Sequence, residues 1–245
     1  MKGTVAAIIP AAGRGARFRG RTRKPFVPIA GRPLLAYTLR TLQHSAAIRW
    51  IQLVVQPEER ARVQALLRRE RITKALPPCA GGASRAESVA KGLAALPREA
   101  SWVLVHDAAR PCVSQALIQR CVRAAKRHGA VACGVPATVT VKAADDAGDV
   151  RLTLDREHLW FVQTPQVFRR DWFETALAHA DHRLSEFPDD ASLVEASGFH
   201  VRLIPGDPLN LKVTTRDDLV LAAVILKRQK VKGKRKNYKA KFKSV

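Results

Sequence analysis

Short, uncharged apolar runs alternate with amphipathic segments through the first 135 residues of the chain. Runs of this length suit strands buried in a parallel sheet, and the amphipathic segments suit the crossover helices that cover such a sheet. The runs are residues 5–9, 50–55, 102–106 and 130–135, and the segments are 34–42, 58–70, 84–96 and 114–128. The alternation predicts an α/β fold with a doubly wound, mostly parallel sheet and right-handed crossovers. We expect one weaker additional strand at 73–76.

The pattern changes after residue 135. Residues 139–142 and 150–154 alternate apolar and polar side chains around a turn rich in Asp, which predicts a β-hairpin. This hairpin would project from the α/β body as an arm of about residues 138–156, either as decoration or as a dimerisation element. Beyond it we expect a helix that begins near 170, helices at 189–197 and 215–230, and a strand at 200–204.

The net charge of +22 is extreme, and part of it is concentrated at the end of the chain. Residues 227–245 contain ten Lys and Arg and no acid, which leaves about +12 for the rest. We expect residues 1–228 to form one domain and residues 229–245 to form a disordered basic tail. Such a tail is typical of contacts with polyanions such as RNA, DNA or anionic lipid.

The cysteines and the apolar stretches indicate a cytoplasmic protein. The four cysteines are scattered and form no CxxC pair, which favours reduced thiols over disulfides or a zinc site. The seven histidines likewise lack the spacing of metal ligands. No apolar run reaches the roughly 18 residues of a membrane span, and no signal-peptide pattern precedes the first strand.

Three loops, residues 10–26, 81–88 and 107–111, leave the carboxyl ends of predicted strands. Ligands of doubly wound sheets bind at that edge, so we expect the three loops to meet at one site. The first loop combines small residues with Arg17 and Lys24. Backbone N–H groups and two cations predict a nucleoside triphosphate site there, although the loop is neither a Walker A motif nor a dinucleotide fingerprint.

Asp107 follows an apolar strand directly, and Arg110 lies three residues later. A carboxylate in this place can share Mg²⁺ with phosphate oxygens. The Arg110 guanidinium can clamp a second phosphate. An ion pair that closes the loop is the simpler alternative for these two residues.

Several motifs together resemble the nucleotidyltransferases that couple a sugar phosphate to a nucleoside triphosphate. The full set resembles the 2-C-methyl-D-erythritol 4-phosphate cytidylyltransferase family and extends over about residues 4–228. The motifs are Pro10-Ala11-Ala12-Gly13 with Arg17 and Lys24-Pro25, then residues 81–89, 106–111, 155–160, 163–166 and 210–214.

This resemblance implies a Rossmann-like nucleotidyltransferase fold and transfer of CMP from CTP to 2-C-methyl-D-erythritol 4-phosphate, with Mg²⁺, in non-mevalonate isoprenoid synthesis. It implies that Arg17 and Lys24 are catalytic and that Asp107 lies at the metal. The residues implied to bind CTP are Ala11, Ala12, Gly13, Gly82, Ser88 and Asp107. Those implied to bind the acceptor substrate are Arg110, Thr140, Arg156, Thr164 and Lys212. Because Thr140 and Arg156 flank the hairpin, the arm-exchanged homodimer of the family would place them in the partner's site.

The implied chemistry needs no general base. The acceptor's phosphate monoester is already largely ionised at pH 7, so in-line positioning and charge neutralisation can carry the reaction. Ala83 stands where the family often has an acid, and Pro188 stands where it often has a Thr. One side-chain contact to the nucleotide and one to the acceptor substrate, both frequent in the family, therefore have no assigned residue in this chain.

Two alternatives remain at this point. A ribitol 5-phosphate cytidylyltransferase would share the fold, the CTP site and the metal, although the middle of 107–111 favours the methylerythritol enzyme. A nucleic-acid-binding protein could retain the same fold and use the basic tail as its contact.

Overall fold

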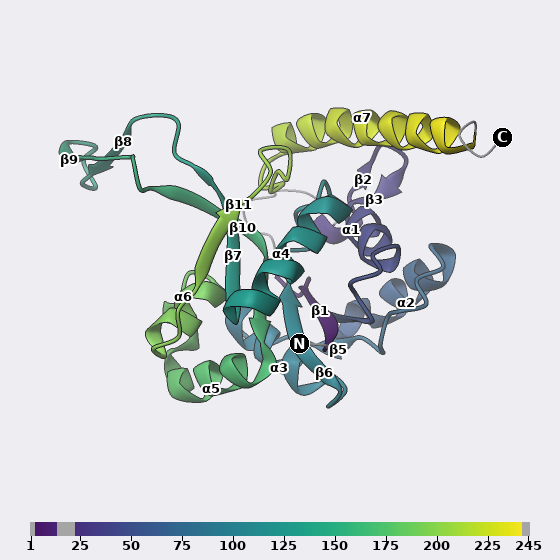
Figure 1. Cartoon of the computed structure of the whole chain (residues 1–245), viewed down its shortest axis with the longest axis horizontal. Coiled ribbons are helices and arrows are strands. Elements are labelled where there is room, and N and C mark those ends of the chain that lie inside the picture. The colour runs from purple at the N-terminus through teal and green to yellow at the C-terminus, as the bar shows by residue number, and fades with distance from the viewer. Residues whose placement is uncertain (1–2, 14–22, 242–245) are drawn as a thin grey trace.

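The central element is a seven-stranded sheet, described here in a computed structural model that covers residues 3–13 and 23–241 (Figure 1). Its strand order is β11-β7-β10-β6-β1-β4-β5. The strands are β1 (Thr4–Pro10), β4 (Trp50–Val55), β5 (Cys79–Ala80), β6 (Ala100–Val105), β7 (Ala130–Pro136), β10 (Trp160–Arg169) and β11 (Arg202–Pro205). Strand β10 is antiparallel to both neighbours, and every other adjacent pair is parallel. The predicted doubly wound, mostly parallel sheet is confirmed.

Helices cover both faces of this sheet. Val5 and Ile9 of β1 belong to the apolar cluster formed with α1 (Leu34–Gln43), α2 (Arg60–Arg69) and α4 (Gln115–His128). Ala6 and Ile8 belong to the opposite cluster, formed with α3 (Arg85–Ala94), α5 (Arg170–Ala180) and α6 (Asp190–Ala196). Residues 5–9 are at most 2% exposed, which explains why the sequence of this strand is continuously apolar rather than alternating.

The strand expected at 73–76 is wrong in its position. Ala75 makes only an isolated parallel bridge to Ile51. Pro77 and Pro78 follow, and because proline has no N–H to donate, regular pairing cannot continue through them. Pairing with β4 resumes at β5, where Cys79 lies opposite Val54.

The hairpin arm is confirmed. Strands β8 (Val141–Ala144) and β9 (Val150–Leu154) pair with each other and form a separate two-stranded sheet. Figure 1 shows the arm extending well away from the body. The remaining short elements are the 3-10 turns η1 (Lys24–Phe26), η2 (Pro57–Glu59) and η3 (Asp181–Glu186) and the ribbon of β2 (Pro28–Ile29) and β3 (Arg32–Pro33).

The last helix is longer than predicted. Helix α7 spans Arg216–Lys241, whereas the sequence led us to end it near residue 230 and to expect a disordered tail from 229. Residues 227–241 are mostly Lys, Arg and other residues that tolerate a helix, without proline, so no local signal stops the helix. Across the described residues, none of the helices has both the length and the apolar character needed to cross a membrane.

A capping box starts helix α7. The Asp218 carboxylate accepts hydrogen bonds from the N–H groups of Thr214 and Thr215, at 2.7 and 2.8 Å. In return the Thr215 hydroxyl accepts from the N–H of Asp218. Burial alone would raise the pKa of Asp218, but these hydrogen bonds lower it to about 2.

Replacing Asp218 by asparagine is expected to lower the free energy of unfolding by about 1 kcal/mol at pH 7. Because the folded pKa lies below the unfolded value of about 3.9, this stabilisation is complete above that value. It is lost as the pH falls through about 2. Urea unfolding at pH 7 and in acid measures the difference, with Asp217→Asn in the same turn as the control. A loss that is equal at both pH values would contradict the account.

Candidate functional site

A cavity of about 560 Å³ opens at the carboxyl ends of β1 and β6. All three loops that were expected to converge contribute to its wall. The predicted site residues that line it are Ala11, Ala12, Gly13, Lys24, Gly82, Ser88, Asp107 and Lys212. Arg17, which was predicted to act beside Lys24, lies outside the described residues.

The first loop is held against strand β4. The N–H of Ala11 donates to the carbonyl of Val54 at 2.8 Å, and the Gln56 side-chain amide donates to the carbonyl of Ala12 at 2.7 Å. Lys24 begins η1 and lines the cavity from the far end of the same loop. These contacts fix a stretch of small residues as one wall of the cavity.

The glycine pair of the second loop permits close approach. A Cβ atom on Gly81 would lie 2.3 Å from Cβ of Ala12, and one on Gly82 would lie 2.4 Å from Cβ of Glu87. The Ser88 hydroxyl accepts from the N–H of Gly82 at 3.1 Å and donates to the Ser84 carbonyl at 2.9 Å. Ser88 therefore shapes this wall by holding the loop to helix α3.

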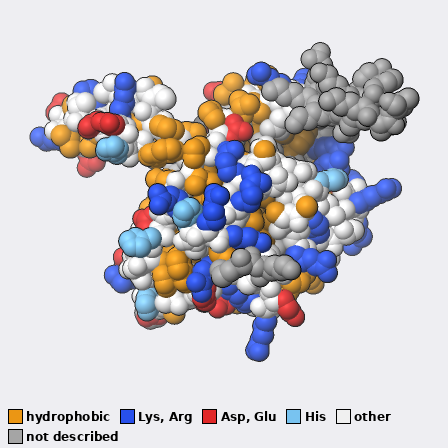
Figure 2. Space-filling view, viewed as in Figure 1, with side chains coloured by type: hydrophobic (Ala, Val, Ile, Leu, Met, Phe, Trp, Pro, Cys, Tyr) orange, Lys and Arg blue, Asp and Glu red, His pale blue; other side chains and the backbone are white. Residues whose placement is uncertain are grey.

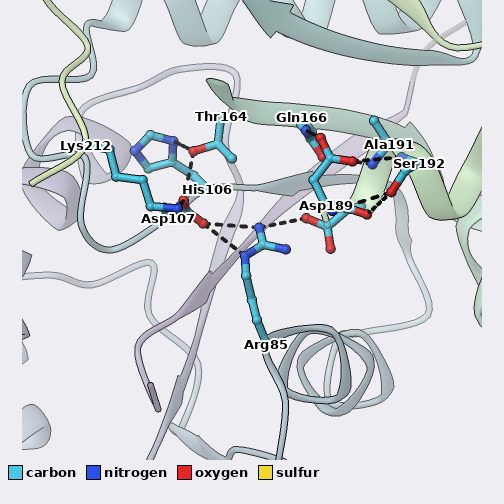
Figure 3. Close-up of polar contacts among 10 residues, drawn as sticks. Arg85, His106, Asp107, Thr164, Gln166, Asp189, Ala191, Ser192 and Lys212 are labelled. Atoms are coloured by element: carbon cyan, nitrogen blue, oxygen red, sulfur yellow. Dashed lines mark hydrogen bonds and ion pairs between the residues drawn. The ribbon is translucent and has the colours of Figure 1, made fainter. Parts of the chain in front are cut away.

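A chain of charges crosses the floor of the site (Figure 3). Lys212 lies 2.8 Å from one carboxylate oxygen of Asp107, and Arg85 lies 3.1 Å from the other. Arg85 also reaches Asp190 at 2.8 Å, and the Asp190 side chain is only 2% exposed. Burial would raise the pKa of Asp107, but the charges of Arg85 and Lys212 outweigh it and hold that pKa far below its usual range.

Asp107 does not fit the role of ligand to a resident metal ion. Both of its oxygens already face cations, and a divalent ion would have to displace one of them. Within residues 3–13 and 23–241, no group of three or more His, Cys, Asp or Glu side chains could hold a metal. In the structure Asp107 forms a buried ion pair with two cations, and its predicted place at the metal stays a prediction.

A second cavity of about 470 Å³ adjoins the first. Arg85, Asp107 and Lys212 line both cavities, so these three charged side chains form a wall that the cavities share. Thr164 and Arg110 line only the second one. The two departures from the family pattern divide in the same way, because Ala83 lines the first cavity and Pro188 the second.

Arg110 is almost completely buried beside the second cavity. One of its terminal nitrogens donates to the carbonyl of Asn210 at 2.9 Å. Its buried Nε has no hydrogen-bond partner within the described part of the chain. An unpaired buried donor is costly, so the Arg110 side chain retains capacity for an anionic or hydroxyl-bearing ligand.

Two residues that were predicted to bind the acceptor substrate lie on the arm and not in this site. Thr140 directly precedes β8, and Arg156 follows β9, where it donates to the carbonyl of Thr138 at 3.0 Å. Neither residue lines the two cavities of its own chain.

Arg85 and Asp190 belong to the site but were not predicted from the sequence. Arg85 is the first residue of helix α3, where the helix dipole disfavours a cation. A cation in that place needs an acidic partner, and this is the signal that could have drawn attention to it. Its partner Asp190 lies 105 residues away, so nothing local in the sequence identifies the pair.

Comparisons with known proteins agree on one family. Residues 5–228 match the family model described as IspD, 2-C-methyl-D-erythritol 4-phosphate cytidylyltransferase. A protein of that name from Pelotomaculum thermopropionicum is 41% identical over 224 residues, which are 91% of this chain and 94% of the relative. One from Gloeobacter violaceus is 39% identical over 223 residues, or 91% and 96% of the two chains.

Solved structures with related names have the same fold. The crystal structure of 4-diphosphocytidyl-2C-methyl-D-erythritol synthase from Anaerococcus prevotii matches with a TM-score of 0.79 at 29% identity, covering 92% of this chain and 96% of that one. The 2-C-methyl-D-erythritol 4-phosphate cytidylyltransferase from Thermus thermophilus matches with a TM-score of 0.73 at 34% identity, covering 91% and 98%.

Proposed function

The chain belongs to the 2-C-methyl-D-erythritol 4-phosphate cytidylyltransferase family, and we propose that it transfers CMP from CTP to 2-C-methyl-D-erythritol 4-phosphate. The products are 4-diphosphocytidyl-2-C-methyl-D-erythritol and pyrophosphate. The resemblance seen in the sequence is confirmed, and the comparisons do not favour a ribitol 5-phosphate enzyme or a nucleic-acid-binding protein.

The observation that carries the proposal is the pair of adjoining cavities with one charged wall. CTP would occupy the first cavity, against the small residues Ala11 to Gly13 and the loop at Gly82. The acceptor would occupy the second cavity, beside Thr164 and Arg110. Lys212 lines both, so it can meet phosphates of either substrate at the place where they react.

Catalysis would rest on position and charge. The acceptor phosphate attacks the α-phosphorus of CTP in line, and pyrophosphate leaves from the opposite side. Arg17 and Lys24 would neutralise the charge that develops on the five-coordinate phosphorus. No residue has to remove a proton, because the attacking oxygen is already ionised.

We assign the divalent cation to the nucleotide. Mg²⁺ binds few protein ligands when substrate phosphates are present, and Asp107 is already occupied by two cations. The metal would therefore enter with CTP as the Mg²⁺ complex of the triphosphate. We expect the dependence of turnover on Mg²⁺ to follow the concentration of that complex.

We further propose a homodimer that is formed through the arm. An isolated two-stranded hairpin is marginally stable in water, and this one exposes Val150 and Leu152, both at 55%. Phe161, at the base of the arm, is 50% exposed. Figure 2 shows apolar side chains gathered where the arm joins the body. Exposed apolar side chains that gather in this way mark an interaction site, and a second copy would cover them.

The dimer would complete each active site with Thr140 and Arg156 from the partner's arm. A mixed dimer of one Lys24→Ala chain and one Arg156→Ala chain, isolated with two affinity tags, then contains one intact site. We expect about half of the wild-type activity from it and little from either parent. A dimer of wild type with a Lys24→Ala/Arg156→Ala chain is the control, because both of its sites carry one defect. A mixed dimer no more active than its parents would contradict the shared site.

Two finer assignments concern location and the basic end of α7. All four cysteines carry free thiols, which supports a reducing compartment such as the cytoplasm.

The ten cations of residues 227–245 support contact with a polyanion. Removing residues 231–245 should abolish salt-sensitive RNA binding and leave turnover unchanged. Retained RNA binding would contradict this assignment.

Pyrophosphate release tests the proposed function. With CTP and Mg²⁺, we expect rapid release when 2-C-methyl-D-erythritol 4-phosphate is the acceptor and little release with ribitol 5-phosphate. Release with ribitol 5-phosphate alone would overturn the proposal.

A further inference from the structure

His106 is completely buried between the two cavities' shared wall and the loop at Arg110. Its Nε2 lies 3.2 Å from the carbonyl oxygen of Arg110. Its Nδ1 lies 3.0 Å from the hydroxyl of Thr164, a contact that Figure 3 shows. The same hydroxyl accepts a hydrogen bond from the N–H of Asp107 at 3.0 Å. His106 thus ties the stretch 106–111 to strand β10, yet the reaction as described above does not use it.

The positions of the protons in this chain follow from the chemistry of the partners. A carbonyl oxygen can only accept, so Nε2 of His106 carries the proton. His106 is completely buried, and burial disfavours the charged form of the imidazole, so the ring carries only the Nε2 proton and Nδ1 is an acceptor. The proton between Nδ1 and Thr164 therefore belongs to the hydroxyl. Thr164 donates to His106 and accepts from Asp107.

This leaves the Thr164 hydroxyl with one free lone pair and no proton for a ligand. Thr164 lines the second cavity, so that lone pair is what it can offer there. A phosphate dianion presents only acceptor oxygens and cannot pair with it. A hydroxyl group can.

We propose that His106 is a positioning residue that holds the Thr164 hydroxyl proton in a hydrogen bond to its Nδ1. Thr164 can then accept a hydrogen bond from a hydroxyl group of the second substrate but cannot donate one to its phosphate. The inference rests on the proposed function, because it takes the second cavity as the acceptor site. It divides recognition in that cavity between two chemistries. Cations such as Lys212 and Arg110 meet the phosphate, whereas Thr164 selects a polyol that places a hydroxyl beside it.

Substitutions at Thr164 test whether its hydroxyl accepts a hydrogen bond from the substrate, and they change the shape of the side chain little. Thr164→Val keeps the volume and removes the hydroxyl, and Thr164→Ser keeps the hydroxyl. We expect Thr164→Val to lower kcat/KM for methylerythritol phosphate about tenfold and Thr164→Ser to stay within about threefold of wild type. KM for CTP should change little in both variants. The melting temperature of Thr164→Val should fall, because the buried Asp107 N–H and His106 Nδ1 lose their partner, whereas that of Thr164→Ser should change little. Inorganic phosphate should inhibit Thr164→Val as strongly as it inhibits wild type.

Two amide variants test His106 itself. The side-chain oxygen of His106→Asn can stand near the place of Nδ1 and accept from Thr164. The longer amide of His106→Gln reaches toward the Arg110 carbonyl instead and leaves the Thr164 proton free. We expect His106→Asn to stay within about threefold of wild type in kcat/KM for the acceptor and His106→Gln to lose about tenfold.

Acceptor analogues that each lack one hydroxyl give the decisive measurement. Wild type should discriminate against one of them by about tenfold or more, and that discrimination should collapse in Thr164→Val and His106→Gln. Undiminished discrimination in Thr164→Val, or weaker inhibition of that variant by inorganic phosphate, would overturn the inference. Absence of pyrophosphate release by wild type with methylerythritol phosphate would instead overturn the proposed function. The two failures are therefore distinguishable.

Discussion

Lys24→Ala is expected to lower kcat about 10²- to 10³-fold while KM for CTP changes little. Lys24 lines the first cavity at the end of the loop that leaves β1. An interaction made mainly in the transition state affects kcat, whereas one made equally in the ground state affects KM. We expect Arg17→Ala to behave in the same way. Steady-state kinetics with CTP and methylerythritol phosphate measure the effect.

Lys126→Ala is the matched control for Lys24→Ala. Lys126 lies on α4, and its ammonium donates to the carbonyl of Gly3 near the start of β1, so it stands at the other end of the sheet. Its removal takes the same charge from the protein without touching the cavity. A loss of activity that appears only as a higher KM for CTP would remove Lys24 from the transition-state role. An equal loss of activity in Lys126→Ala would show that the effect comes from the change in net charge and not from the position of Lys24.

Arg85→Met is expected to lower the free energy of unfolding by about 3 to 5 kcal/mol, because it leaves Asp190 buried without its partner. Asp190 is 2% exposed, and Arg85 lies 2.8 Å from it. Burial raises the pKa of Asp190, and the charge of Arg85 opposes that rise. Denaturant unfolding at pH 7 measures the change.

Asp190→Asn in the Arg85→Met background should recover part of the lost stability, because a neutral amide replaces the unpaired charge. Arg151→Met supplies the exposed comparison, since the Arg151 side chain is 72% exposed beside Asp145. We expect that variant to cost less than about 1 kcal/mol. Equal losses in Arg85→Met and Arg151→Met would show that burial of Asp190 does not govern the effect.

The sequence predicted most of what depends on local pattern. Continuous apolar runs and the small residues after β1 identified the sheet, its carboxyl edge and the first cavity. The hairpin arm followed from alternation around an Asp-rich turn. These features are predictable because each depends on residues that are close together in the chain.

Features that depend on distant partners were not predictable in the same way. Asp107 suits a metal by itself, and only the folded chain brings Arg85 and Lys212 to its two oxygens. The role of His106 likewise depends on Thr164, which is 58 residues away. The misplaced strand at 73–76 has a local cause, because the two prolines that follow it should have limited its pairing.

The stereochemical course at the α-phosphorus tests the central claim most directly, namely that the acceptor phosphate attacks CTP in a single in-line step. A single diastereomer of CTP with sulfur on the α-phosphorus is treated with methylerythritol phosphate and Mg²⁺, and the configuration of the product is determined. We predict inversion, because one in-line displacement inverts the phosphorus. Retention would contradict the account, since it requires two displacements and a covalent nucleotidyl-enzyme, for which this mechanism assigns no residue.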